Sequence, residues 1–138
     1  MSGDRILRAH PGIGPRVTAA ALVASDYFSA RYDLDRINGV FSRPAHRLYG
    51  QGYVGRVLVL LGAKGGVATA WMLREMAARR MAPAALLLNT SNPIMAQGAA
   101  FADLAFMDRF DIDVTAAIPN GARVTVDPAA GTVTIHAG

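Results

Sequence analysis

The clearest pattern of hydrophobic positions lies in the middle of the chain, where two short apolar runs each lead through a polar loop into a helical repeat. Residues 55–61 predict a buried strand, and apolar positions from 67 to 80 recur with the spacing of a helix that buries one face. Residues 84–88 predict a second buried strand, and a helix over 94–100 follows its loop. Two successive strand–loop–helix units indicate parallel strands joined by right-handed crossovers, because parallel neighbours need a long connection.

The two ends of the chain have β patterns instead. Residues 3–16 are rich in glycine and proline and predict an irregular N-terminal arm, whereas residues 17–24 predict the first strand. The Asn-Gly pair at 38–39 predicts a turn between extended segments. Residues 122–126 and 132–136 alternate apolar and polar side chains, which is the pattern of an antiparallel hairpin. The sequence therefore predicts an α/β fold with a mixed sheet, two main helices and a C-terminal hairpin.

Composition indicates one domain spanning residues 1–138. The chain is 52% hydrophobic and only 17% charged, a balance that favours a folded core over disorder and leaves apolar surface for a partner. The net charge of +4 comes from basic residues spread along the chain, with no basic run interleaved with aromatic residues, so we expect no binding to nucleic acid. The positive sign favours a modest attraction for anionic substrates.

Cysteine, a metal-binding pattern and long apolar segments are absent from the sequence, and this narrows the class of protein further. There is no cysteine, so this chain supplies no disulfide and no thiolate ligand for an iron–sulfur cluster. No pair of histidines has the spacing of metal ligands, so we expect no metal site. The N-terminus lacks the apolar core of a signal peptide, and the longest apolar runs are far too short to cross a bilayer. We therefore expect a cytoplasmic protein without membrane contact.

The glycine-rich turn at 62–66, Gly-Ala-Lys-Gly-Gly, carries the sharpest local signal for a ligand. Gly65 and Gly66 let backbone N–H groups approach a bound anion, the following helix presents unpaired N–H groups, and Lys64 adds a positive charge. The turn lacks the serine or threonine of a Walker loop and the spacing of a dinucleotide fingerprint. Taken alone, it is as compatible with a structural connection as with anion binding.

The loop after the second buried strand favours the binding interpretation. Asn92 is a candidate N-cap, with Pro93 at the first helical position. This loop leaves its strand at the same edge of the sheet as the glycine turn, and such edges are the usual ligand sites of parallel sheets. Thr69, in the first turn of the other predicted helix, has a hydroxyl that serves either as a cap or as a ligand donor.

The remaining candidates each have a structural alternative. A lone histidine such as His46 is more often structural or at the surface than in contact with substrate. Trp71, Met72 and Met76 favour packing in the core over a cofactor-binding cluster, because they lie at helical spacing. The aspartates, Asp113 among them, are candidates for turns or caps.

These elements in this order resemble the small subunit, or swivel domain, of the aconitase X family. The resemblance runs from about Ala20 to the C-terminus. Its best segments are His46-Arg47-Leu48-Tyr49-Gly50-Gln51-Gly52, the strand at 55–60 with the glycine turn, Ala82-Pro83-Ala84-Ala85, and Asn92-Pro93-Ile94 with Gln97-Gly98-Ala99.

The resemblance implies a swivelling β/β/α domain, with a mixed sheet or barrel-like core, that docks on a large aconitase X subunit. The site between the two subunits would dehydrate a small hydroxylated carboxylic acid, such as cis-3-hydroxy-L-proline or, mainly in archaea, phosphomevalonate. Any iron–sulfur cluster would belong to the large subunit. The substrate-binding candidates in this chain are Gly65, Gly66, Val67, His46 and Asn92.

The chain departs from the family at a catalytic position. Typical members have a serine-rich stretch after the glycine turn, and its leading serine is thought to act as the base; here that position is Gly66. Glycine has no side chain to accept a proton, so the base is Lys64, Thr69 or a group on the partner, or the reaction is a different one. The family's proline after the motif histidine is Arg47 here. The alternative function is a swivel-domain paralogue that binds or regulates without catalysing.

Overall fold

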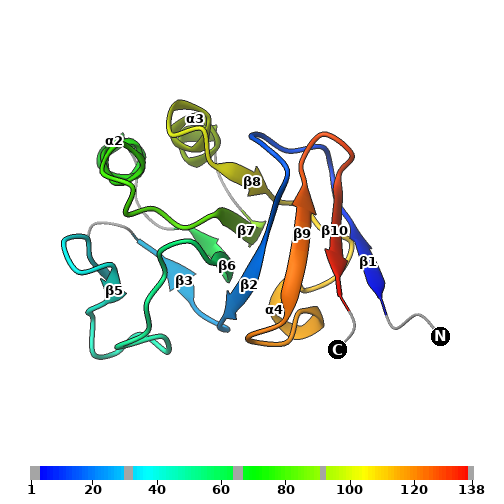
Figure 1. The fold of residues 1–138 in the computed structure, drawn as a ribbon, viewed down its shortest axis with the longest axis horizontal. Coiled ribbons are helices and arrows are strands. Elements are labelled where there is room, and N and C mark those ends of the chain that lie inside the picture. Colours follow the sequence, from blue (N-terminus) through cyan, green and yellow to red (C-terminus); the bar gives the residue numbers. More distant parts are fainter. Residues whose placement is uncertain (1–3, 30–32, 64–66, 91–92, 137–138) are drawn as a thin grey trace.

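Seven strands follow one another across a mixed sheet in the computed structural model of the chain, which describes residues 4–29, 33–63, 67–90 and 93–136 (Figure 1). In sheet order the strands are β1 (Arg5–Arg8), β10 (Thr132–Ile135), β9 (Arg123–Asp127), β2 (Val17–Val23), β6 (Val57–Ala63), β7 (Ala85–Thr90) and β8 (Ala105–Met107). The short strand β3 (Tyr27–Phe28) pairs with the end of β6, and β4 (Leu34–Asp35) pairs with β5 (Val40–Phe41) in a separate hairpin.

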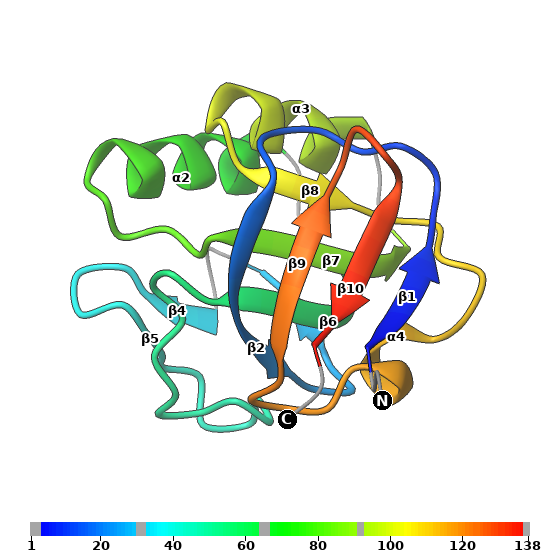
Figure 2. The ribbon, with the colours of Figure 1, turned by 45° about the vertical axis from the view of Figure 1, so that its right-hand side comes forward.

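The parallel half of the sheet consists of β2, β6, β7 and β8, as the two strand–loop–helix units predict. Helices α2 (Val67–Ala78) and α3 (Pro93–Phe101) form the crossovers and lie side by side on one side of these strands (Figures 1 and 2). The predicted strands and both main helices are therefore confirmed. Among the described residues a further short helix, α4 (Val114–Ala117), was not predicted.

The antiparallel half joins β2 to β9, β10 and β1, and it confirms the C-terminal hairpin. The prediction of an irregular arm over residues 3–16 is wrong for residues 5–8, because these form β1 against β10. This strand has one buried side chain, Leu7, in four residues, so it shows no alternation in the sequence. Its partner lies more than a hundred residues away, and that pairing is what makes it a strand.

Residues 9–13 close the sheet into a barrel-like core. The Ile13 N–H donates to the Phe106 carbonyl at 2.9 Å, and the Phe106 N–H donates back to the Ile13 carbonyl at 2.8 Å. Gly12 makes this approach possible, because a Cβ built on it would lie 2.1 Å from the Phe106 oxygen. The arm is therefore held between the antiparallel half and β8.

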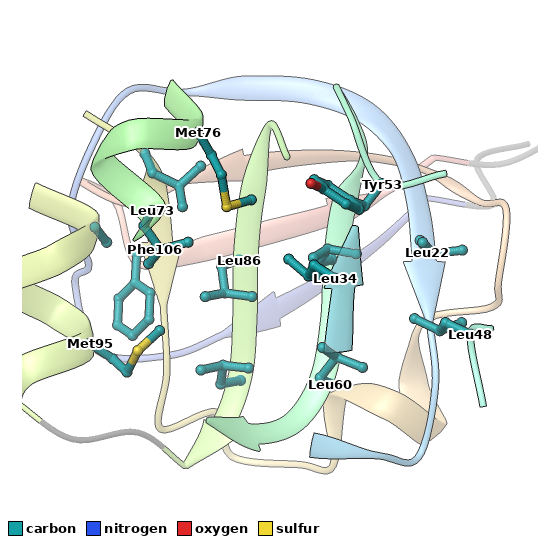
Figure 3. Packing of buried hydrophobic residues seen from close by; sticks show 14 of the residues in the cluster. Leu22, Leu34, Leu48, Tyr53, Leu60, Leu73, Met76, Leu86, Met95 and Phe106 are labelled. Carbon is teal, nitrogen blue, oxygen red and sulfur yellow. The ribbon is translucent and has the colours of Figure 1, made fainter. Parts of the chain in front are cut away.

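The two faces of β6 and β7 are both buried, which explains why these strands read as continuous apolar runs. Val57, Val59 and Leu87 face the barrel interior, where Val114 of α4 joins them. The alternate residues face the helices, and Figure 3 shows them packed together. From the strands these are Leu58, Leu60, Leu86 and Leu88, and they pack against Leu73 and Met76 of α2 and Met95 of α3.

Helix α2 corrects one prediction of the core. Leu73 and Met76 pack against the sheet, whereas Trp71 is 60% exposed. Two residues correspond to about 200° of rotation on a helix, so Trp71 and Leu73 cannot face the same side. The expected stripe of Trp71 with Met76 is therefore wrong. None of the helices in the described part of the chain is long and apolar enough to cross a membrane.

Candidate functional site at the carboxyl edge of the parallel strands

The carboxyl ends of three parallel strands meet at one edge of the sheet. Strand β3 ends at Phe28, β6 at Ala63 and β7 at Thr90, and the register pairs Phe28 with Ala63 and Gly62 with Thr90. Helix α2 begins at Val67, directly after this edge, and α3 begins after β7. The first turns of both helices have N–H groups without helical partners and a positive dipole end, so this edge favours negative charge.

Most of the sequence-predicted site residues belong to the two loops at this edge. Lys64, Gly65, Gly66 and Asn92 lie outside the described residues. Val67 and Thr69 are in the first turn of α2, and their side chains likewise lie outside the described part. The roles assigned to these six residues stay predictions.

Gly62 and Thr90 form a close pair at the same edge. A Cβ built on Gly62 would lie 2.7 Å from the Thr90 Oγ1 and 3.3 Å from the Tyr27 ring. A side chain at residue 62 would therefore displace the Thr90 hydroxyl. Sequence reasoning missed Thr90, although it is the polar residue at which the apolar run of β7 ends.

Asn89 fixes the neighbouring helix α4 to the end of β7. Its Nδ2 donates to the Asp113 Oδ1 at 2.7 Å, and its Oδ1 accepts from the Val114 N–H at 2.9 Å. Asp113 is the N-cap of α4 and also accepts from the Thr115 N–H and hydroxyl. The hydrogen bond from Asn89, followed by those from Thr115, lowers the pKa of Asp113. Asp113 thus confirms the expectation of a cap and carries a stable negative charge.

His46 is buried beside this edge and has no exposed side-chain surface. Its Nδ1 accepts from the Leu48 N–H at 3.0 Å, so its Nε2 carries the proton and donates to the Tyr27 carbonyl at 2.8 Å. The ring also stacks on Phe41. Because Tyr27 pairs with Gly62, His46 positions the strand next to the glycine turn. A contact with substrate would require one of its two hydrogen bonds to open.

Two carboxylates flank His46, with the Oδ2 atoms of Asp26 and Asp33 at 3.8 and 3.9 Å from its Nε2. Asp33 is buried and pairs with the half-buried Arg43. Partial burial raises the pKa of Asp26, but the hydrogen bonds from the Tyr27 and Arg47 N–H groups, together with the positive charge of Arg43, lower it overall. This cluster was not predicted, because hydrogen bonds between the segments 26–29 and 33–47 hold it together and no motif marks them, among them the bond of His46 to the Tyr27 carbonyl and that of the Arg47 N–H to the Asp26 Oδ2.

The described part of this edge has groups that would favour a small anionic ligand. It offers two helix N-termini, the Thr90 hydroxyl and a rigid frame formed by Asn89 and the Asp26–Asp33–Arg43–His46 cluster. Within residues 4–29, 33–63, 67–90 and 93–136, no three histidine, aspartate or glutamate side chains gather as metal ligands.

Comparisons with known proteins agree with this architecture. Residues 6–135 match the family described as "Aconitase X swivel domain". The chain is 32% identical over 127 residues to the phosphomevalonate dehydratase small subunit of Methanocella arvoryzae, covering 92% of this chain and 96% of that protein. It is 34% identical over 121 residues to the small subunit of the same name from Methanothrix thermoacetophila, covering 88% of each.

Two solved structures have the same fold. The crystal structure of Thermococcus kodakaraensis aconitase X in its holo-form superposes with a TM-score of 0.89 at 22% identity, covering 96% of this chain and 99% of that one. The solution NMR structure of a UPF0107 protein gives a TM-score of 0.87 at 26% identity, covering 96% and 100%. The predicted fold class is therefore confirmed.

Proposed function

Because this chain belongs to the aconitase X swivel-domain family, we propose that it is the small subunit of an aconitase X type dehydratase and is inactive without a large subunit. One observation carries this proposal, namely similarity along nearly the whole chain to proteins named as dehydratase small subunits. The chain has no cysteine, so a cluster of iron and sulfur would have to be held by the large subunit.

The substrate that suits this edge is a small hydroxylated carboxylic acid. Its anionic group would be bound at residues 64–66, where the N-terminus of α2 and the charge of Lys64 both favour an anion. Thr90, beside Gly62, is an additional hydrogen-bonding group within the same edge. The names of the relatives favour phosphomevalonate, and cis-3-hydroxy-L-proline is the second candidate.

Dehydration needs a base that removes a proton from carbon while the hydroxyl leaves. Gly66 stands where the family has its serine, so the base is Lys64, Thr69 or a group of the large subunit. The same glycine favours the alternative function, a swivel domain that binds or regulates without catalysing.

The decisive experiment is co-expression with the aconitase X large subunit from the same genome, followed by assays of both substrates. We expect turnover by the complex and none by this chain alone. Turnover by the isolated chain would contradict the shared site. A complex that stays inactive on both substrates, even with Gly66→Ser, would favour the non-catalytic alternative.

Two variants of the complex test the glycine turn. Lys64→Ala should weaken substrate binding by about ten- to a hundredfold, because a direct charge-assisted contact contributes about 1.5–3 kcal/mol. Gly66→Ser should preserve or raise turnover if a hydroxyl at this position acts as the base, and should weaken binding if the site has been rebuilt around glycine. Unchanged binding and turnover in both variants would mean that the turn is only a connection.

A further inference from the structure

Two aromatic side chains on the helices stand exposed to solvent next to each other. Trp71 of α2 is 60% exposed and Phe101 of α3 is 64% exposed. These two side chains line a groove with about 240 Å³ of space between the two helices, whose course is seen in Figure 2. The groove, called here the α2/α3 groove, is lined by Ala70, Trp71, Arg74, Ile94, Gln97 and Phe101.

The helix spacing makes this groove a continuous surface. On α2, Arg74 lies three residues after Trp71 and four after Ala70, and on α3 the lining residues are likewise three and four residues apart, so each set forms one stripe. These stripes are separate from the core-facing residues Leu73 and Met76. The groove is therefore an outer face of the helix pair and not an unfilled part of the core.

The floor of the groove is narrow because the two helices cross closely beneath it. A Cβ built on Gly98 would lie 2.7 Å from the Ala70 Cα and Cβ, so the helix backbones approach as far as small residues allow. Large side chains stand only at the rims. Neighbouring exposed apolar side chains around a concave floor are typical of an interaction site.

The rim also carries positive charge. The Arg74 guanidinium lies 5.5 Å from the Trp71 ring centroid, which places a basic group over the aromatic face at the rim. Arg79 and Arg80 are exposed further along the chain, and Glu75 pairs with Arg79 at 3.4 Å. A second copy of this chain packed groove against groove would bring these like charges together, so the charge favours a partner with carboxylates.

We infer that the α2/α3 groove is the docking surface for the large subunit, which inserts an apolar segment flanked by acidic residues. The inference rests on the proposed function. The groove starts in the first turns of α2 and α3, at Ala70 and Ile94, and both helices begin at the candidate site. A subunit that completes the site at this edge therefore lies against the start of the groove. If the same subunit extends along the groove, it buries the rings of Trp71 and Phe101.

The chain provides its own probe, because Trp71 is its single tryptophan. Labelling with 5-fluorotryptophan gives one fluorine resonance that reports on the groove alone. We expect this resonance to shift when the unlabelled large subunit is added, and to stay unchanged when more of this chain is added.

Substitutions measure the contribution of the groove. Trp71→Ala and Phe101→Ala should each weaken affinity for the large subunit by at least about tenfold, since buried aromatic anchors dominate such interfaces. The double variant should no longer co-elute with it. Ile6→Ser is the matched control, because Ile6 is an exposed apolar residue on β1, away from the helices (Figure 1), and it should leave affinity unchanged.

The outcomes separate this inference from the proposed function. If the complex forms but the resonance does not shift, or both variants bind with wild-type affinity, the groove is not the docking surface and the proposed function stands. A dimer of this chain that Trp71→Ala abolishes would overturn the inference in favour of self-association. If the wild-type chain forms no complex at all, the proposed function and the inference both fail. Unchanged melting temperatures establish that the variants are folded.

Discussion

The antiparallel half of the sheet and the parallel half use their strand ends in different ways. Strands β9 and β10 are joined by the short turn at 128–131, so the chain returns at once into the ladder. Strands β6 and β7 instead lead into helices, and each leaves a loop at the carboxyl edge. The candidate site lies wholly beside these loops, because parallel connections leave strand ends open to a ligand whereas hairpins do not.

The two halves also differ in how they are buried. Strand β10 alternates half-buried and buried side chains, so one face packs on the barrel interior. Residues 57–60 of β6 and 85–88 of β7 are buried without interruption, since the barrel lies on one face and the helices on the other. The parallel half is therefore the more rigid support for the site. The following substitutions test this difference in rigidity between the two halves.

The largest effect should come from truncating a leucine in the parallel half. Leu86→Ala should lower the free energy of unfolding by about 4 kcal/mol, because neighbours on a central strand cannot close the cavity. Leu7→Ala, the matched change on β1, should cost about 2–3 kcal/mol, since this end strand has more freedom to relax. Urea unfolding measures both, and equal losses would contradict the difference in rigidity.

A smaller effect is expected where the halves meet. Gly12→Ala should lower the free energy of unfolding by about 1–3 kcal/mol, because its Cβ would collide with the Phe106 carbonyl of β8. Gly52→Ala is the control, since a Cβ there would meet only the Gly39 oxygen at 3.8 Å. If the two variants melt at the same temperature, the arm is not closely packed against β8.

The smallest effect concerns the frame of the site. Asp113→Ala should cost about 1 kcal/mol at neutral pH, because α4 loses its N-cap. The lowered pKa of Asp113 means that its charge stabilises the folded state above the unfolded value of about 3.9, and this contribution is lost as pH falls through the folded pKa.

The control is Asp113→Asn, which keeps a capping oxygen without the charge. The difference in unfolding free energy between wild type and Asp113→Asn should shrink between pH 5 and the folded pKa. A difference that is independent of pH would show that the charge of Asp113 has no part in holding α4.

Sequence reasoning succeeded where the signal is local. The strands at 57–63 and 85–90 and the hairpin at 123–135 are visible in hydrophobic spacing and in the loops that bound them. Strands β1, β3 and β8 have four, two and three residues, too few to show a period, and distant partners define them. The prediction that Trp71 packs in the core was wrong because neighbouring apolar positions on the helix were assigned to one face.

In the candidate site, too, features with a local signal could be predicted and contacts between separate segments could not. Its place at the carboxyl edge could be predicted, because parallel pairing brings successive strand ends together. The contacts of His46 could not be predicted, since they join residues 26, 33, 43 and 46 through side-chain contacts between segments that no motif marks. The groove beside Trp71 depends on how closely Gly98 lets the helices approach, which spacing alone does not define.

The closure between Ile13 and Phe106 has a consequence for how the protein behaves at high concentration. The outer strand of an open sheet presents unpaired N–H and C=O groups, and such an edge recruits strands from other molecules into aggregates. Here the arm engages both backbone groups of Phe106 within the same molecule. A change at Gly12 that dislodged the arm would expose β8 as a free edge, and precipitation would then accompany the loss of stability.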